Sequence, residues 1–325
     1  MPDCGSQSCG SFFRADNTNT GESANLPAIL ALTNQSWRVL ISSSNGAVCE
    51  INNASYASEM NRIHAQRFWG LLKSKEGTNE LVFNNPISVK LKDARTCESL
   101  CETDNLEFTV SRGIDSQDHF TETYTLENTG ALPRLFSPAS TFLTVPFNDS
   151  CETGAPNCLT QNCNAHLWAG GGSSWVNAVR MGGMAPHLGL VLTAGSLDGY
   201  SILEGGASSN DRGNLAFNPS SFELKPGETY VISWELFWHD GWPDFWSKVM
   251  RQPNFVRLQA AHYTAVQEQQ IQISADSGSS LENAVLRLNG REVAVTHDGK
   301  RLSASIKTDQ PGEQTFELEN EGQIS

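Results

Sequence analysis

The sequence lacks the local motifs that identify many enzymes. It has no GxSxG nucleophile elbow, no HExxH metal motif, no P-loop and no GxGxxG turn after a strand. No apolar run approaches the roughly 20 residues that cross a bilayer. With a net charge of -14 and no basic block, the chain also lacks the clustered Lys and Arg that nucleic-acid phosphates require. These absences exclude nucleic-acid binding and a membrane span, and they leave no catalytic motif.

Cysteine, by contrast, is present and closely spaced. The eight cysteines include the near neighbours Cys4/Cys9, Cys97/Cys101 and Cys151/Cys158/Cys163. An even count at short spacings predicts local disulfides and therefore a secreted, extracellular protein. A zinc site built from Cys158, Cys163 and His166 is the alternative, but CxxC pairs are missing and no second ligand cluster follows. We therefore expect no metal and no cofactor.

Short strand-like segments separated by turn residues fill residues 29–239. WRVLIS (37–42) and AVCEIN (47–52) flank Asn45-Gly46, which favours a type I′ hairpin. A second hairpin is predicted where Pro226-Gly227 separates SSFELK (220–225) from TYVISWELFWH (229–239). Further strands are predicted over 67–73, 80–83, 88–94, 106–114, 119–128, 141–147, 175–181, 187–193 and 200–205. Many strands without amphipathic helices between them predict an all-β fold, a large antiparallel sandwich or barrel.

The two ends of the chain differ from this central part. Residues 1–28 are polar and are expected to form an N-terminal arm. Residues 240–264 are expected to be a linker with a short helix, 245–252, capped by Asp240 or Asp244 and stopped by Pro253. From 265 to 325, clean alternation with few aromatics predicts a small immunoglobulin-like sandwich. The chain stops directly after a strand-like run, so we expect a fragment of a longer protein.

The densest group of candidate site residues lies between 147 and 203. Trp168 and Trp175 flank three glycines, an arrangement suited to stacking on a pyranose ring. The alternative is two core tryptophans around a turn. His166 and His187 are candidates for hydrogen bonds to sugar hydroxyls or for proton transfer. An epimerase would need a Glu partner for one of them, for which Glu204 and Glu235 are the candidates.

Other candidates lie on or after predicted strands. Arg180 either grips a uronate or a pair of hydroxyls, or forms a structural ion pair. Next to Trp238, the residues His239, Asp240, Trp242 and Asp244 concentrate polar and aromatic groups where the sandwich meets the linker. The two carboxylates, four residues apart, are candidates for paired acid–base work. Helix capping and domain docking are the alternative for these residues.

These segments resemble a known architecture. LKPGETYVISWELFWHDGWPDFWSKV, followed by a helical linker, is similar to the N-terminal supersandwich of certain glycoside hydrolases, of the galactose mutarotase-like class. PFND (146–149), NAHLWAGGGSSWV (164–176), RMGG (180–183) and PHLGLVLT (186–193) resemble a family of large secreted bacterial glycosidase-like proteins of uncharacterised activity. The resemblance implies that an immunoglobulin-like module and an (α/α)6 toroid of the six-hairpin type follow, and that the toroid carries the catalytic carboxylates.

The resulting prediction is a β-supersandwich over 29–239, then a helical linker and an immunoglobulin-like sandwich. Its expected role is that of a non-catalytic region that shapes a glycan cleft for an absent catalytic domain of the same polypeptide. The expected partners are that domain and an oligo- or polysaccharide. A self-contained epimerase or polysaccharide lyase, and an adhesion or scaffold module without sugar binding, remain as alternatives.

Overall fold

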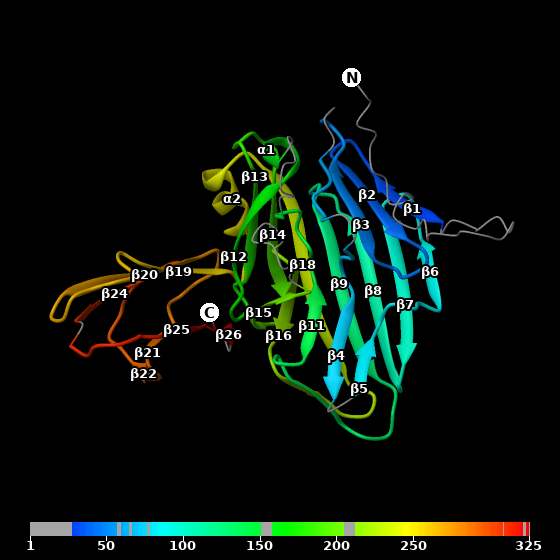
Figure 1. The fold of residues 1–325 in the computed structure, drawn as a ribbon. Helices are drawn as coiled ribbons and strands as arrows, with labels where there is room; N and C mark the ends of the chain where they lie inside the picture. The colour runs from blue at the N-terminus through cyan, green and yellow to red at the C-terminus, as the bar shows by residue number, and fades with distance from the viewer. Residues whose placement is uncertain are drawn as a thin grey trace, which may run out of the picture.

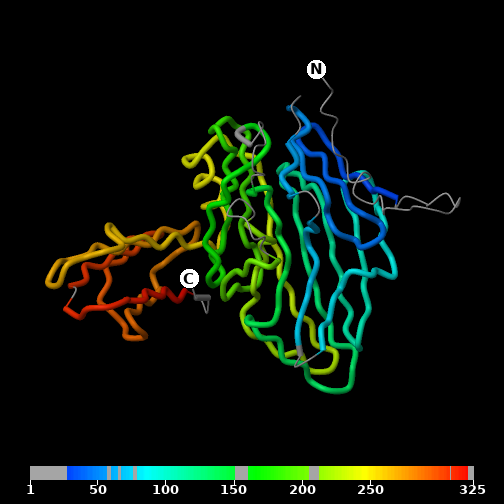
Figure 2. The backbone as a smooth tube through the Cα atoms, viewed as in Figure 1, coloured from blue at the N-terminus to red at the C-terminus, as the bar shows by residue number. Residues whose placement is uncertain are grey.

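A computed structural model describes residues 28–56, 60–64, 67–76, 79–150, 158–204, 212–307, 309–320 and 323–324. Antiparallel strands dominate this part of the chain, and they form one large two-layered sandwich and one smaller unit (Figures 1 and 2). The predicted all-β class is confirmed. Within the described residues, neither helix has the length and apolar character to span a bilayer.

The first layer of the large sandwich is an eight-stranded sheet in which every neighbouring pair is antiparallel. In spatial order its strands are β12 (Cys163–Trp168), β13 (Trp175–Arg180), β14 (His187–Ala194), β18 (Thr229–His239), β9 (Phe120–Asn128), β8 (Leu106–Ile114), β7 (Thr96–Thr103) and β6 (Ser88–Leu91). Burial alternates along β8 and β9, so one face of the sheet is buried against the second layer. The opposite face is called the outer face below.

The second layer consists of a five-stranded and a three-stranded sheet. The five-stranded sheet has the order β15 (Leu197–Leu203), β16 (Asn214–Pro219), β11 (Thr141–Thr144), β4 (Leu72–Glu76) and β5 (Asn79–Val82). The three-stranded sheet contains β1 (Ile29–Thr33), β2 (Trp37–Ser42) and β3 (Val48–Asn53). A bridge between Val48 and Trp69 connects the second layer's two parts, and Gly46 turns the predicted β2–β3 hairpin at φ 70°.

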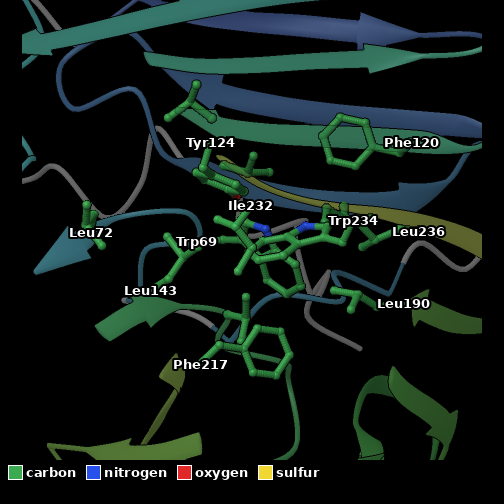
Figure 3. Close-up of a cluster of buried hydrophobic side chains, with 14 of the residues drawn as sticks. Trp69, Leu72, Phe120, Tyr124, Leu143, Leu190, Phe217, Ile232, Trp234 and Leu236 are labelled. Atoms are coloured by element: carbon green, nitrogen blue, oxygen red, sulfur yellow. The ribbon is translucent and has the colours of Figure 1, made fainter. Parts of the chain in front are cut away.

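The core between the layers is aromatic at its centre. Trp69, Phe217 and Trp234 are fully or almost fully buried, and Trp234 packs at 4.7 Å from the ring of Tyr124 (Figure 3). Large rings remove much apolar area from water at the junction of the sheets. The long alternation of β18 supplies Ile232, Trp234 and Leu236 to this core, so the odd-numbered residues of β18 face outward.

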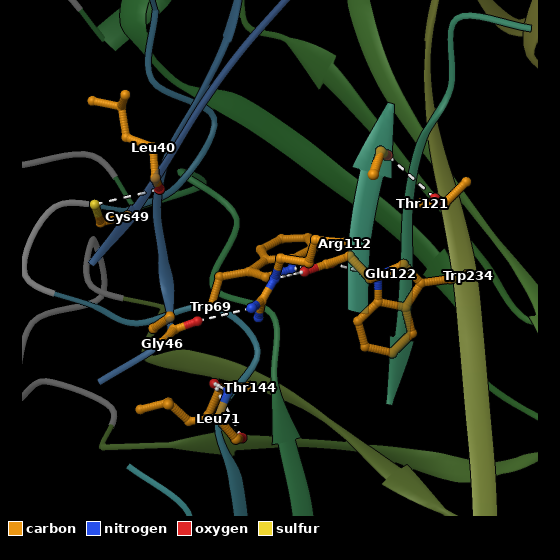
Figure 4. A network of polar contacts seen from close by, with 12 residues as sticks. Leu40, Gly46, Cys49, Trp69, Leu71, Arg112, Thr121, Glu122, Thr144 and Trp234 are labelled. Atoms are coloured by element: carbon orange, nitrogen blue, oxygen red, sulfur yellow. Dashed lines mark hydrogen bonds and ion pairs between the residues drawn. The ribbon is translucent and has the colours of Figure 1, made fainter. Parts of the chain in front are cut away.

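A buried ion pair lies within the same core. The Arg112 Nε donates to Glu122 Oε1 at 2.7 Å, and both side chains are almost completely excluded from solvent (Figure 4). Glu122 Oε2 also accepts hydrogen bonds from the indole nitrogens of Trp69 and Trp234, at 2.6 and 2.8 Å. Arg112 reaches across to the carbonyl of Gly46 at 2.8 Å. The network thus connects β8, β9 and β18 to the second layer.

The smaller unit contains two four-stranded sheets with a core of its own. One has the order β19 (Val256–Ala260), β20 (Gln270–Ser277), β24 (Arg301–Lys307) and β23 (Thr296–Asp298). The other has the order β22 (Arg291–Glu292), β21 (Val285–Leu288), β25 (Phe316–Asn320) and β26 (Gln323–Ile324). Val256 belongs to this core, so its first strand begins inside the predicted linker. Its immunoglobulin-like character stays a prediction.

Several local predictions were wrong. The Pro226-Gly227 turn exists, with Gly227 at φ 78°, but its flanking strands do not form a hairpin. Instead, β17 (Phe222–Leu224) pairs with β10 (Arg134–Phe136), while β18 enters the large sheet. The Cys97/Cys101 staple is also wrong, because both thiols are free and buried on β7. Cys163 is free as well, whereas Cys4, Cys9 and the side chains of Cys151 and Cys158 lie outside the described residues.

A close approach at Gly189 on β14 gives a first test of this packing. A Cβ built at Gly189 would lie 2.4 Å from the Phe237 ring of the paired strand, so the ring occupies the space of a side chain. We expect Gly189→Ala to destabilise the protein by about 1–3 kcal/mol, as overpacking does in dense cores. Urea unfolding followed by tryptophan fluorescence measures this change.

Gly113 on β8 offers the matched control for that variant. Its added Cβ would meet Thr96 at an ordinary 3.4 Å, so Gly113→Ala should leave the free energy of unfolding within about 0.5 kcal/mol of the native value. Equal stability of the Gly189→Ala and Gly113→Ala variants would contradict the close packing of the Phe237 ring, from β18, against Gly189 of β14.

Candidate functional site

A short helix packs on the outer face of the eight-stranded sheet and adds its own side chains to that surface. Helix α2 (Trp242–Val249) starts at Gly241, which has no side-chain capping bond, and has a proline in its first turn. The predicted caps, Asp240 and Asp244, are therefore not the N-cap residue. The Asp244 carboxylate instead accepts a hydrogen bond from the Asp240 main-chain N–H at 3.1 Å and pairs with Lys248 at 2.9 Å. Phe245 and Val249 anchor the helix on the sheet beside Val191 and Phe237.

Aromatic rings gather where α2 meets strands β12 and β13, and we call this group the aromatic platform. It consists of His166, Trp168, Trp175, Trp242 and Trp246. Trp168 and Trp175 are directly paired across the two strands. Trp175 lies edge-on to both Trp242 and Trp246, with ring centroids 6.0 and 5.1 Å apart. His166 lies 5.4 Å from Trp242. The platform thus joins residues from three elements.

Part of this platform faces solvent. Trp168 is 57% exposed and Trp242 is 39% exposed, whereas Trp175 is partly buried beneath the helix. A Cβ at Gly170 would lie 3.3 Å from the Trp168 indole, so the ring lies against the glycine backbone. Arg257 covers Trp246, with its guanidinium carbon 4.0 Å from the ring centroid. Trp168 and Trp242 therefore present the accessible aromatic surface that could stack on a sugar ring.

His187 and His239 lie below this surface, directly paired across β14 and β18. Their rings are 5.3 Å apart, and both side chains are buried. Burial lowers the pKa of His187, and the charges of Arg62 and Arg180 lower it further. Burial lowers the pKa of His239 to about 4, with a further contribution from His187. Both rings are therefore neutral at pH 7, which suits a packing role under α2.

Arg180 and Trp238 point away from the platform. The Arg180 main-chain N–H donates to His187 Nδ1 at 3.1 Å, and its Nη1 donates to the Ala185 carbonyl at 3.3 Å. Trp238 packs in the sandwich core, 4.6 Å from the ring of Trp37. Arg180 is buried and forms no ion pair with a described carboxylate, so the predicted structural pairing is absent from the described residues.

The predicted site residues thus form separate groups. His166, Trp168 and Trp175 share one surface, His187 and His239 form a buried pair, and Arg180 and Trp238 belong to the inner side. Asp240 is exposed beside the start of α2. Of Trp242 and Trp246, which complete the platform, only Trp242 was among the residues singled out from the sequence, at the sandwich–linker junction. Their position near a helix start after an aromatic strand was the available signal.

The zinc alternative does not fit the strand geometry. Cys163 and His166 are both on β12, but Cys163 is fully buried in the core and His166 is exposed on the outer face. Residues three apart on a strand point to opposite faces. Cys163 and His166 therefore cannot share a metal ion in this arrangement.

The outer face also holds a histidine–carboxylate pair that sequence reasoning missed. His119 Nδ1 lies 3.3 Å from Glu235 Oε1, and both side chains are largely buried. Glu235 was a candidate partner for His166 or His187, but within the described residues neither of those histidines forms an ion pair. The sequence signal for His119 was its position directly before β9, whose odd-numbered residues lie on the outward side of the sheet.

Comparisons with known proteins found similar folds among solved structures. It matches a polysaccharide lyase of known structure with a TM-score of 0.81 and 28% identity, over 90% of this chain. The chain spans 46% of that lyase. A galactose mutarotase-related enzyme from Lactobacillus acidophilus matches 65% of the chain at 11% identity with a TM-score of 0.45. No protein-family model and no curated protein sequence matches.

Proposed function

We propose that this chain is the non-catalytic, carbohydrate-binding β-sandwich region of a secreted polysaccharide-degrading enzyme. The observation that carries this proposal is the exposed aromatic platform at the junction of β12, β13 and α2. Indole faces pack on the apolar C–H faces of sugar rings, and flat exposed rings lose little conformational freedom on binding. Trp168 and Trp242 provide two such faces on one side of the sheet.

The likeness to a polysaccharide lyase supports the choice of ligand class. That likeness extends over nearly the whole chain, which corresponds to less than half of the lyase. Residues beyond this region would then supply the catalytic domain with which the sandwich forms a cleft. The glycoside hydrolase parent expected from the sequence stays a prediction, and the lyase likeness favours eliminative cleavage of a polysaccharide instead.

The scaffold alternative expects a hydrophilic sheet face with both Trp168 and Trp175 buried. Trp168 is instead more than half exposed, and it shares the exposed platform with Trp242 and His166. Grouped exposed rings of this kind, unlike single ones, indicate an interaction surface. The platform therefore favours a ligand-contacting role over a purely structural one.

Substitution of the exposed tryptophans tests the proposal. We expect Trp168→Ala and Trp242→Ala each to weaken polysaccharide binding by about 1–3 kcal/mol, the range found for loss of an aromatic stacking partner. Affinity electrophoresis against a panel of acidic and neutral polysaccharides identifies the ligand. Titration calorimetry with that ligand then measures the loss.

Tyr200→Ala is the matched control, because Tyr200 is 53% exposed on β15 of the other layer. It removes a comparable exposed ring and should leave binding unchanged. Native-like circular dichroism confirms that each variant is folded. A folded double variant at Trp168 and Trp242 that binds as tightly as the native chain would rule out the platform as the sugar-binding surface.

A further inference from the structure

Three side chains with metal-ligating atoms converge at the β8–β9 turn. Asp115 and His119 belong to this turn, and Glu235 projects from the outer face of the neighbouring strand β18. One ligand atom from each residue lies within 4.8 Å of the other two. Metal–ligand distances for nitrogen and oxygen are about 2.0–2.2 Å, so ligand atoms of one ion lie at most about 4.4 Å apart. A small inward rotation of these side chains therefore brings the three atoms around a single ion.

Neighbouring groups hold two of these side chains in place. Asp115 Oδ1 accepts hydrogen bonds from the main-chain N–H groups of Gln117 and His119, both at 2.8 Å. The Gln252 amide donates to Glu235 Oε1. Hydrogen bonds of this kind orient metal ligands in proteins and reduce the entropy lost when an ion binds. The carboxylates are therefore preorganised by the turn and by the segment that follows α2.

The histidine supplies an independent observation. His119 is only 9% exposed to solvent. Its Nδ1 is excluded from water and has no hydrogen-bond partner. That nitrogen lies 3.3 Å from Glu235 Oε1, outside hydrogen-bonding geometry. An unprotonated Nδ1 and a carboxylate oxygen at this distance repel each other, so either a proton or a cation between them stabilises the cluster. A metal ion takes the place of that proton and completes the bonding of a buried polar atom.

We propose that Asp115, His119 and Glu235 bind a divalent transition-metal ion of the Zn²⁺ class. Imidazole nitrogen favours Zn²⁺ and related ions over Ca²⁺ and Mg²⁺, which prefer oxygen ligands alone. Two carboxylates balance the charge of a divalent ion, and the chain's net charge of -14 favours cation binding in general. Three protein ligands leave a coordination position open for water or a hydroxyl group.

Titration of EDTA-treated protein without a histidine tag tests the site. We expect isothermal titration with ZnCl₂ to show one ion bound per chain, and a higher midpoint of thermal unfolding with Zn²⁺ than without it. His119→Gln and Asp115→Asn should each weaken Zn²⁺ binding at least tenfold. Asp115→Asn keeps the side-chain oxygen that the turn uses, so this variant tests the ligand role without loss of the turn.

His262→Gln is the control, because His262 is exposed and lies outside both the cluster and the aromatic platform. It should bind Zn²⁺ as the native chain does. Three results would overturn the proposal: no saturable Zn²⁺ binding, equal binding by native chain and cluster variants, or equal affinity for Ca²⁺ and Zn²⁺. Since none of these measurements involves sugar, the site and the proposed carbohydrate binding fail or succeed separately.

Discussion

Glu122→Ala is expected to destabilise the protein by about 3–5 kcal/mol, the cost of breaking a buried ion pair by removing one partner. The substitution leaves the Arg112 guanidinium buried without a countercharge, because that side chain is 1% exposed and Glu122 is its ion-pair partner. It also removes the acceptor for the indole nitrogens of Trp69 and Trp234. Urea unfolding at pH 7, followed by fluorescence, measures the loss.

Two further variants separate charge from packing. Glu127→Ala removes a carboxylate from the outward side of the same strand and should change stability by less than about 0.5 kcal/mol. Replacing both members of the pair by apolar residues, Arg112→Met with Glu122→Leu, should recover much of the loss, since no buried charge then remains. A Glu122→Ala protein as stable as the native chain would show that the pair does not contribute to the core.

Much of the large sheet follows from alternation in the sequence. Strands β8 and β18 have the predicted bounds, because burial alternates along β8 and β18 is rich in β-branched and aromatic residues. Strand β7 was missed because its two cysteines were interpreted as a staple, although they occupy alternating buried positions. Strand β12 was missed because its inward residues include Cys163 and Ala165, whose apolar signal is weak.

Strand partners were much less predictable than strands. The turn at Gly227 has the sequence of a hairpin, yet β17 joins β10 and β18 is placed between β9 and β14. Turn residues determine how the backbone reverses, whereas pairing depends on where each strand buries its apolar face. Local sequence contains the first kind of information and little of the second.

The same limit applies to the candidate sites. The Trp168–Trp175 pair was predictable because a single glycine-rich turn separates the two residues. Trp242 reaches His166, and Glu235 reaches His119, only because β18 is a central strand and α2 folds back over it. These juxtapositions depend on non-local sheet order, which one sequence without relatives does not reveal.

The outer face therefore combines two environments along one sheet. Toward β12 it presents exposed rings, and toward β9 it presents a carboxylate–imidazole cluster, with α2 and its following segment between them. Phe237 contacts both sides of this arrangement, lying 5.7 Å from Phe245 and 6.0 Å from the ring of His119. The packing of α2 consequently positions both sites, and loss of the helix contact would disturb both.

Acidification is expected to destabilise the native protein through His239. Its pKa falls from 6.5 to about 4 on folding, chiefly because of burial, with a further effect of His187. The unfolded chain therefore binds the proton more readily. The stabilisation is complete above pH 6.5 and is lost as the pH falls toward 4, on the order of 3 kcal/mol from this group. Urea unfolding at a series of pH values from 8 to 4 measures the slope.

The carboxylates titrate alike in the native protein and in the His239→Phe variant. The difference between the two proteins in the pH dependence of the free energy of unfolding therefore isolates the contribution of His239. His239 Nε2 is buried without a hydrogen-bond partner and the ring lies 5.3 Å from Phe245, so a phenyl ring is compatible with the site. The variant should lose less stability between pH 6.5 and 4 than the native chain. His119 acts in the opposite sense, because its interaction with Glu235 raises its pKa and its contribution is lost only as the pH rises. Identical slopes for the native chain and His239→Phe would mean that His239 is protonated as readily in the folded state as in the unfolded one, and that burial under α2 does not exclude its charge.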